Sequence, residues 1–305
     1  MAEITAALVK ELREKTGAGM MECKKALTET GGDLEGAIDF LRKKGLSVAE
    51  KKAGRVASQG LVGVVVEGNA GAIVELNSET DFVARNAEFQ AMLTKMLGAA
   101  LQTKGDVEAM KAETVDGKTI DATLTELIAK IGENMTLRRA GHVFVENGVV
   151  VPYMHTAVVP NQGKIGVLVA LESTADKAQL TELGKKIAMH IAAASPRFLS
   201  VEDVDAETLA HEKSIYEEQA KASGKPANII EKMVEGRIRK FHEEVVLLEQ
   251  AFIMDPDQKI KNVVAQASKE LGTDVALKSY VRFALGEGIE KKSEDFAAEV
   301  SSCLK

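Results

Sequence analysis

The sequence of 305 residues has no tryptophan and few other aromatic residues, which make up 4% of it. This scarcity disfavours a large aromatic-lined ligand pocket and a base-stacking platform for single-stranded nucleic acid. Its two cysteines, Cys23 and Cys303, lie near opposite ends without a CxxC or Cys/His grouping. A disulfide framework and a zinc site are therefore not supported. We expect two free thiols and a function that lies on a surface.

The chain also lacks a surplus of positive charge, since 39 Lys and Arg residues face 46 Asp and Glu residues. Direct binding of nucleic acid is therefore not expected, because neutralising phosphates normally needs a basic surplus. No apolar run approaches the roughly 18 residues of a membrane span. The first twenty residues carry charges throughout, unlike a signal peptide. We expect a globular, cytoplasmic protein without a membrane partner.

Sequence signatures of catalysis are missing as well. The segment Gly117–Thr119 has Ala112 where a phosphate loop needs glycine, and Gly17–Gly19 has Glu22 where a dinucleotide fingerprint needs its third glycine. The five histidines are scattered without the spacing of metal ligands. We therefore expect no enzyme activity, no cofactor and no metal site.

The N-terminal part predicts a small bundle of three helices. Apolar residues recur at helical spacing between the N-cap Thr5 and Gly17, which ends the first helix. A second helix is predicted over Met21–Thr30, and Asp33 caps a third. Residues 42–55 predict a polar, partly helical linker. So small a bundle buries little apolar area, which is more typical of a docking module than of a site for chemistry.

The middle of the chain contains a weak internal repeat. Residues 61–78 and 155–173 each predict two strands joined at an Asn-x-Gly turn, and each copy is followed by a helix with matching apolar positions. A duplicated hairpin-plus-helix unit predicts antiparallel sheets with helices against one face, which is an α+β fold. Between the copies, Val107–Lys130 predicts mostly helix.

The C-terminal third predicts an antiparallel helix pair followed by a return to the core. Its two helices, over Ala206–Ala222 and Pro226–Phe241, are joined at residues 223–225, and an apolar seam runs along the second. Such a pair can project as an arm that contacts a partner. A strand over Tyr280–Leu285 and a terminal helix over Ile289–Leu304 complete the prediction.

The segment Ser78–Arg85, between a strand and the next helix, combines an acid with a bulky aromatic side chain. One interpretation is that Thr80 or Asp81 caps the helix while Phe82 packs against the core. The other is that Phe82 is exposed on a rigid corner and fills a pocket of a partner. The second copy of the repeat keeps an acid here but no aromatic, which favours the partner role.

Two long segments resemble the signature segments of bacterial translation elongation factor Ts. They are LREKTGAGMMECKKAL at residues 12–27 and ELNSETDFVAR at residues 75–85. Residues 224–237 and 282–300 add support, and the order of modules along the whole chain is similar to that of the family. The resemblance implies a UBA-like N-terminal bundle and an antiparallel coiled-coil arm linked to a homodimer or a 2:2 complex.

The resemblance also implies a division of the chain into modules. The helical bundle and linker are residues 1–54, the two core subdomains are 55–140 and 141–196 with 245–285, the coiled-coil arm is 197–244, and the C-terminal helical module is 286–305.

The function implied by the resemblance is that of a guanine-nucleotide exchange factor for GDP-bound elongation factor Tu. In the family, the TDFV corner enters the partner's nucleotide-binding domain, displaces its magnesium ion and promotes GDP release, so that GTP can bind. This role maps onto Thr80, Asp81, Phe82 and Val83. Further contacts with the partner map onto Arg13, Met20, Met21, Lys24, His155 and Phe296.

Two alternatives stay open at this stage. Met20 and Met21 are equally compatible with packing in the core of the bundle, and Lys24 with a solvated charge. A helical adaptor that binds a partner without changing nucleotide exchange is the alternative function. The two functions differ at Phe82: removing its ring from an adaptor lowers affinity and function together, whereas removing a wedge lowers the exchange rate more than the affinity.

Overall fold

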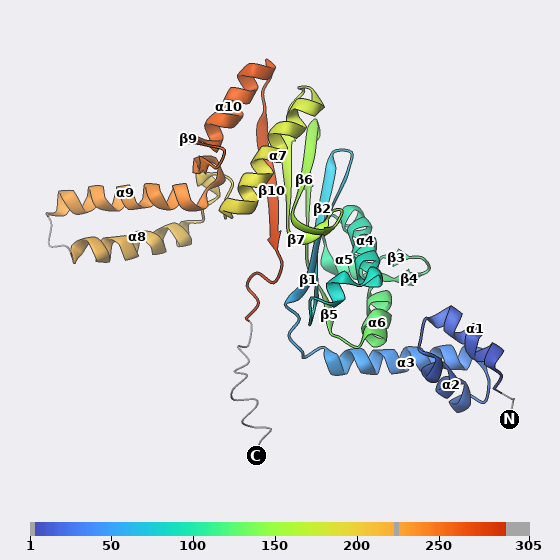
Figure 1. The fold of residues 1–305 in the computed structure, drawn as a ribbon. Coiled ribbons are helices and arrows are strands. Elements are labelled where there is room, and N and C mark those ends of the chain that lie inside the picture. Colours follow the sequence, from blue (N-terminus) through green and yellow to red (C-terminus); the bar gives the residue numbers. More distant parts are fainter. Residues whose placement is uncertain (1–3, 223–225, 291–305) are drawn as a thin grey trace. The chain divides into compact units, whose positions relative to one another are not determined.

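The computed structural model describes residues 4–222 and 226–290 (Figure 1). The terminal helix predicted over Ile289–Leu304 lies outside the described residues apart from its first two positions, and Phe296 and Cys303 lie outside as well. The chain forms two compact units. Unit 1 comprises the residues up to Val62, Val74–Ala140 and the residues from Ala284 onward, and unit 2 comprises Gly63–Ile73 and Gly141–Phe283.

The described residues contain both helices and strands, and the paired strands β3–β4, β6–β7 and β8–β9 are antiparallel, in keeping with the α+β prediction. Unit 1 holds α1 (Ala6–Thr16), α2 (Met20–Glu29), α3 (Leu34–Lys52), α4 (Ala87–Gln102), α5 (Val107–Ala112), β3 (Thr114–Val115), β4 (Lys118–Thr119) and α6 (Ile120–Ile131). Unit 2 holds β6 (Gly148–Val159), β7 (Gln162–Glu172), α7 (Lys177–Ala194), α8 (Ala206–Lys221), α9 (Ala227–Val245), β8 (Ala251–Phe252), β9 (Asp255–Lys259) and α10 (Ile260–Leu271). Residues of both units belong to β1 (Gln59–Glu67), β2 (Ala70–Ser78), β5 (Met135–Phe144) and β10 (Ala276–Ala284).

The three N-terminal helices form where the sequence predicts them, and side-chain caps begin the first and the third. The side chain of Thr5 accepts a hydrogen bond from the backbone N–H of Leu8 at 3.3 Å, and Gly17 ends α1 in the left-handed region with φ of 67°. The bundle has a core of its own, in which Leu12, Cys23 and Leu27 are fully buried. The N-terminal prediction is therefore confirmed for these helices.

Helix α3 continues further than the sequence suggested. It begins after the N-cap Asp33, whose carboxylate accepts from the N–H of Gly36 at 3.0 Å, and it ends at Lys52. Most of the expected linker over residues 42–55 is thus one continuous helix. Its second half packs on α6, with Gly45 so close that a Cβ atom there would meet Ala129. This tertiary contact supplies the support that the polar sequence alone does not show.

Both copies of the predicted hairpin-plus-helix repeat are present. Strands β1 and β2 are followed by α4, and strands β6 and β7 are followed by α7. The antiparallel pairing of β6 with β7 runs from Gly148 opposite Glu172 to Val159 opposite Gln162, so β6 begins earlier than the predicted start at residue 155. Within the described residues, one sheet has the strand order β10-β7-β1-β2-β5, with β6 paired to β7.

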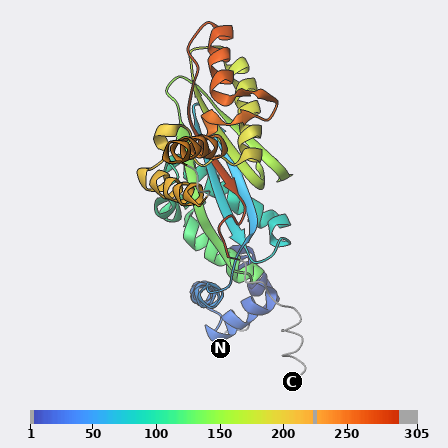
Figure 2. The same cartoon turned by 90° about the vertical axis from the view of Figure 1, so that its left-hand side faces the viewer.

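The core of unit 2 lies between its hairpin and its helices. Helix α7 packs along β6 and β7 (Figure 1 and Figure 2), where Ile187 and Ile191 join the fully buried Leu171. Helix α10, which the sequence analysis did not predict, adds Ile260 and Val264 to the same cluster. Their burial away from water is the main favourable contribution to this core.

Helices α8 and α9 pack side by side, as the apolar seam predicted. Phe241 of α9 is buried and forms a cluster with Val204 and Val246, against which Leu209 and Tyr216 of α8 pack. The connection predicted at residues 223–225 lies outside the described part of the chain. No helix among the described residues combines the length and the apolar character that crossing a membrane requires.

Candidate functional site

The corner after strand β2 is longer than a simple turn. Strand β2 ends at Ser78, a single 3₁₀ turn covers Val83–Arg85, and α4 begins only at Ala87. The N-cap of α4 is Asn86, whose Oδ1 accepts from the N–H groups of Glu88 at 2.8 Å and of Phe89 at 3.4 Å. The interpretation that Thr80 or Asp81 caps this helix is therefore wrong, because Asn86 lies at the position where the helical backbone begins.

Phe82 points its ring into solvent. Its side chain is 77% exposed, whereas the next two residues, Val83 and Ala84, are each only 5% exposed. The interpretation that Phe82 packs against the core is therefore wrong as well. Full burial of such a side chain is worth about 1.5–3 kcal/mol, so its exposure forgoes a stabilisation that a partner can recover. An exposed aromatic side chain next to buried residues that fix its backbone is typical of an interface anchor.

The backbone before Phe82 is held by a carboxylate from a distant part of unit 1. Glu133 accepts from the N–H of Thr80 at 3.0 Å through Oε2 and from the hydroxyl of Thr80 at 2.8 Å through Oε1. The hydroxyl of Ser78 also donates to the carbonyl oxygen of Thr80 at 2.8 Å. Three groups of Thr80 are thus engaged, which fixes the direction in which the chain enters the corner.

A second carboxylate, that of Glu79 in the corner, accepts a hydrogen bond from the segment that carries Glu133. Glu79 accepts from the N–H of Asn134 at 2.6 Å, and the side-chain amide of Asn134 donates to the carbonyl oxygen of Arg55 at 2.7 Å. Arg55 in turn places its guanidinium 3.4 Å from Glu79. Adjacent residues on the two segments therefore clamp each other, so the corner keeps its shape without a partner.

The sequence analysis did not identify Glu133 and Asn134. They follow Gly132, which ends α6 in the left-handed region with φ of 83°, and they lead into β5. Their contacts with the corner span more than fifty positions of sequence. A Gly-Glu-Asn turn after a helix is a local signal for a turn, but nothing local indicates which segment its side chains reach.

The contact residues predicted on the bundle are all exposed. Met20 is 51% and Met21 76% exposed at the start of α2, which excludes the interpretation that they pack in the core. Arg13 on α1 and Lys24 on α2 are exposed too. These residues lie on the helical bundle, whereas the TDFV residues form the corner after β2, so two separate surfaces of unit 1 carry them.

His155 belongs to unit 2. It is exposed on β6, and its Nδ1 lies 3.2 Å from the hydroxyl of Tyr153, with the two rings stacked at a centroid separation of 6.2 Å. Phe296 lies outside the described residues. The predicted site residues are therefore distributed over the chain, and four of them are consecutive in the corner after β2.

The corner offers shape rather than reactive chemistry. The carboxylates of Glu79 and Glu133 are occupied by hydrogen bonds that hold the backbone, while Asp81 and Phe82 face solvent. Among the residues that the structure describes, no group of His, Cys, Asp and Glu is arranged to hold a metal ion. What the corner can do is insert an aromatic ring with an adjacent negative charge into a complementary surface.

Comparisons with known proteins agree on one family. A family model described as "Elongation factor TS" matches residues 79–287. The elongation factor Ts of Rhodospirillum rubrum is 62% identical over 308 residues, which cover the whole of both chains. That of Rhodospirillum centenum is 61% identical over 304 residues, 99% of each chain. That of Caulobacter vibrioides is 58% identical over 307 residues, 99% of this chain and 98% of the relative.

Proposed function

Because the chain belongs to the elongation factor Ts family, a family of translation elongation factors, we propose that it is the guanine-nucleotide exchange factor for elongation factor Tu. It binds the GDP-bound form in the cytoplasm and accelerates GDP release without making or breaking covalent bonds. The observation that carries this proposal is Phe82, which is 77% exposed on a corner whose neighbouring backbone is clamped.

The mechanism follows from differential binding. Phe82 wedges into the nucleotide-binding domain of elongation factor Tu with Thr80, Asp81 and Val83 around it, and the elements that coordinate magnesium move. Magnesium neutralises the phosphate charge, so its displacement weakens GDP binding. The factor accelerates release because it binds the distorted partner better than the GDP-bound one. By linkage, nucleotide and factor weaken each other's binding equally, so GTP then drives the factor off.

A rigid corner suits this mechanism. A flexible loop that carried Phe82 would lose conformational entropy when it became ordered on the partner, and this cost would reduce the binding free energy available for distortion. The hydrogen bonds from Thr80 to Glu133 and from Asn134 to Glu79 fix the corner before binding. Because the corner is already ordered, less of the binding free energy is lost in ordering it, and more is available to stabilise the distorted partner.

The other surfaces hold the partner while the corner acts. Arg13, Met20, Met21 and Lys24 on the UBA-like bundle and the C-terminal residues around Phe296 contact the nucleotide-binding domain, and His155 contacts another domain. Helices α8 and α9 form the coiled-coil arm, through which two copies assemble into a homodimer or a 2:2 complex. The division into a helical bundle, two core subdomains, an arm and a C-terminal module, as predicted from the sequence, is part of this proposal.

The test is the release of a fluorescent GDP analogue from elongation factor Tu with excess unlabelled GDP. A tenth of an equivalent of this protein suffices if it turns over, so acceleration of release from the whole population supports exchange. Binding to elongation factor Tu without any acceleration would overturn the proposal and leave the adaptor function. Phe144, 56% exposed in unit 2, supplies the matched control variant for later substitutions of Phe82.

A further inference from the structure

The hairpin of β6 and β7 in unit 2 (Figure 1) carries a pair of interacting rings near its end. On β6, Val149 and Val151 are buried in the core of unit 2. Tyr153 is partly buried and packs against the same core, whereas His155 is exposed. These four residues alternate along the strand, so they lie on one face of it. That face leaves the core at Tyr153, and His155 is its first exposed residue.

Tyr153 holds the ring of His155 from one side. Its hydroxyl oxygen lies 3.2 Å from Nδ1 of His155, and the two rings stack with their centroids 6.2 Å apart and an angle of 29° between their planes. Within the part of the chain that the structure describes, Nε2 of His155 makes no hydrogen bond. One ring nitrogen is therefore engaged inside the protein, and the other is available to a partner.

The hydrogen bond between the two side chains decides which ring nitrogen carries the proton. A tyrosine hydroxyl and a neutral imidazole can each donate and accept. The phenol is the stronger acid of the two and the imidazole nitrogen is the stronger base, so the bond is favoured with the hydroxyl as the donor. Nδ1 then accepts, and the ring proton lies on Nε2. His155 consequently presents a hydrogen-bond donor to a partner.

The backbone directly after His155 is strained. Thr156 has φ of 56°, in the left-handed region that β-branched residues rarely adopt. The opposite strand makes room for it, because a Cβ atom on Gly163 would lie only 2.6 Å from the carbonyl oxygen of Thr156. The register of β6 and β7 also shifts between Ala157 and Val159. Such strain costs stability and clusters at ligand-binding sites, so it supports a contact role for this end of the hairpin.

We infer that Tyr153 is a positioning residue, which holds His155 so that the N–H group at Nε2 donates to an acceptor oxygen of elongation factor Tu. This inference rests on the proposed function, in which His155 contacts the partner, and it names the chemistry of that contact. A side chain that is immobilised only on binding loses rotational freedom, which reduces the binding free energy. Tyr153 orders the ring of His155 beforehand, and it touches neither the partner nor the nucleotide.

The first test needs no partner. The histidine rings of the full-length protein are labelled with nitrogen-15, and their chemical shifts are followed to a pH above which they no longer change and the rings are neutral. The signals of His155 are those that His155→Gln removes. They are expected to show the proton on Nε2, and Tyr153→Phe, which deletes only the hydroxyl, should move them toward those of a mixture of tautomers. A proton on Nδ1, or shifts that Tyr153→Phe leaves unchanged, would overturn the inference.

The second test identifies the atom of His155 that the partner meets. In a titration of GDP release, His155→Ala is expected to raise the concentration of factor that gives half-maximal acceleration roughly tenfold, which is the loss of one good hydrogen bond. His155→Gln keeps an amide N–H near the position of Nε2 and should raise it less than about threefold. His155→Asn, whose shorter amide reaches only the position of Nδ1, should behave as His155→Ala. Equal losses for the glutamine and asparagine variants would contradict a donor at Nε2.

The third test is a double-mutant cycle that separates positioning from a general structural role. Tyr153→Phe alone is expected to raise the half-maximal concentration about threefold, with the rate at saturation within about twofold of the wild type. Once His155 is alanine, the same substitution should have almost no effect, because the hydroxyl acts through the imidazole ring. Equal effects of Tyr153→Phe in the two backgrounds would show that Tyr153 does not act through His155.

A matched control is available in the same unit. The hydroxyl of Tyr280 donates to the carbonyl oxygen of Pro196 at 2.9 Å, so Tyr280→Phe also removes one bonded hydroxyl. It should leave the half-maximal concentration unchanged at a temperature where both variants are folded, and shifts equal to those of Tyr153→Phe would make Tyr153 merely structural. If the wild type itself does not accelerate GDP release, the proposed function fails. A wild type that accelerates release, with a Tyr153→Phe variant that matches it, contradicts this inference alone.

Discussion

The two copies of the hairpin-plus-helix repeat differ most at the corner between strand and helix. In the second copy, β7 ends at Glu172, and Asp176 caps α7 by accepting from two backbone N–H groups at 3.1 Å. In the first copy, residues 79–85 separate the end of β2 from the cap Asn86. The added residues include the exposed Phe82 and the clamped Thr80. The second copy shows what the scaffold needs, and the additional residues of the first copy are the part that we propose serves a partner.

The largest effect is expected at the ring of Phe82. Phe82→Ala should lower the saturating rate of GDP release roughly 30-fold, because losing about 2 kcal/mol of the stabilisation that the ring gives to the distorted partner corresponds to that factor. Its thermal stability should hardly change, because the ring is 77% exposed. The control Phe144→Ala, which removes another exposed ring, should leave the rate unchanged. Equal losses in the two variants would show that the corner has no special role.

The clamp on Thr80 is expected to have the next largest effect. Glu133→Ala leaves the N–H and hydroxyl of Thr80 without their acceptor, and it should lower the rate of GDP release roughly tenfold and the stability by about 1–3 kcal/mol. The loss of rate should largely disappear when Phe82 is already alanine, because the clamp acts through the ring. Additive effects of the two substitutions would show that Glu133 acts elsewhere.

The N-cap residues of α4 and α7 allow the effect of a lost cap on stability to be compared with its effect on GDP release. Asp176→Ala and Asn86→Ala each remove a cap and should each lower the free energy of unfolding by about 1 kcal/mol, as measured by urea denaturation. Asp176→Ala should leave GDP release unchanged, because none of the proposed partner contacts lies at its corner. Asn86→Ala should slow release about twofold, since the cap closes the corner that holds Phe82. A slower release with Asp176→Ala would remove the distinction between the copies.

A smaller effect concerns a buried histidine on helix α7 of the second copy. His190 is 1% exposed, with Nε2 2.9 Å from Gln250, and its Nδ1 accepts from the N–H of Ile253 at 3.3 Å. Burial lowers the pKa of His190, which outweighs the opposite effect of the hydrogen bond with Gln250. Below pH 6.5, the ordinary pKa of a histidine side chain, the unfolded chain therefore binds a proton that the folded chain does not.

The stability of the wild type should consequently fall as the pH drops from 7 to 5, by at most about 1.4 kcal/mol per pH unit from this residue. His190→Met, which copies the buried Met96 of α4 in the first repeat, should remove this part of the pH dependence. Urea denaturation at pH 7 and pH 5 measures the difference. An identical pH dependence in His190→Met would show that His190 titrates normally.

Local signals in the sequence were enough for the elements with clear ends. The caps Thr5 and Asp33 and the stop Gly17 lie within a few residues of the helices they delimit. The two hairpins were equally accessible, because strand patterns and turn residues recur in both copies. These elements depend on neighbours in sequence, so the sequence alone predicts them.

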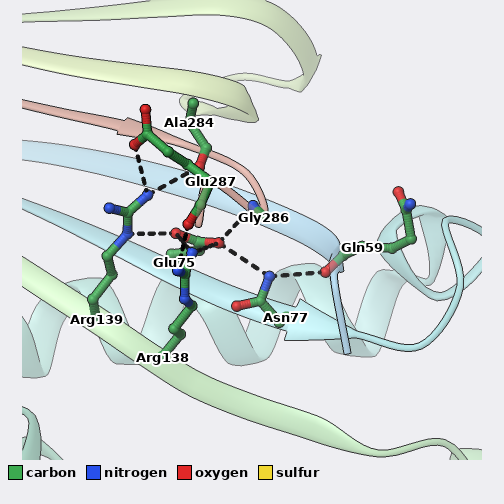
Figure 3. Close-up of polar contacts among 8 residues, drawn as sticks. All are labelled: Gln59, Glu75, Asn77, Arg138, Arg139, Ala284, Gly286 and Glu287. Atoms are coloured by element: carbon green, nitrogen blue, oxygen red, sulfur yellow. Dashed lines mark hydrogen bonds and ion pairs between the residues drawn. The ribbon is translucent and has the colours of Figure 1, made fainter. Parts of the chain in front are cut away.

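The elements that were missed depend on distant partners. Strand β5 carries the adjacent charged residues Arg138 and Arg139, which interrupt the alternation of apolar and polar residues expected of a strand. Their place in the sheet is explained only by their ion pairs with the buried Glu75 (Figure 3). Helix α3 continues because α6 packs on its second half. In the corner, the exposure of Phe82 was one of two interpretations, whereas Glu133 could not be found, because its contact with Thr80 spans 53 positions of sequence. Tertiary contacts decided each case.

The most direct test of the wedge compares two quantities for one variant. For Phe82→Ala, the saturating rate of GDP release can be measured with the fluorescent GDP analogue, and the dissociation constant for GDP-bound elongation factor Tu can be measured by titration in excess GDP. The account predicts that the rate falls at least several times more than the affinity, because the ring acts on the conformational change of the partner. Equal losses of rate and affinity would contradict it and would make Phe82 an ordinary binding contact.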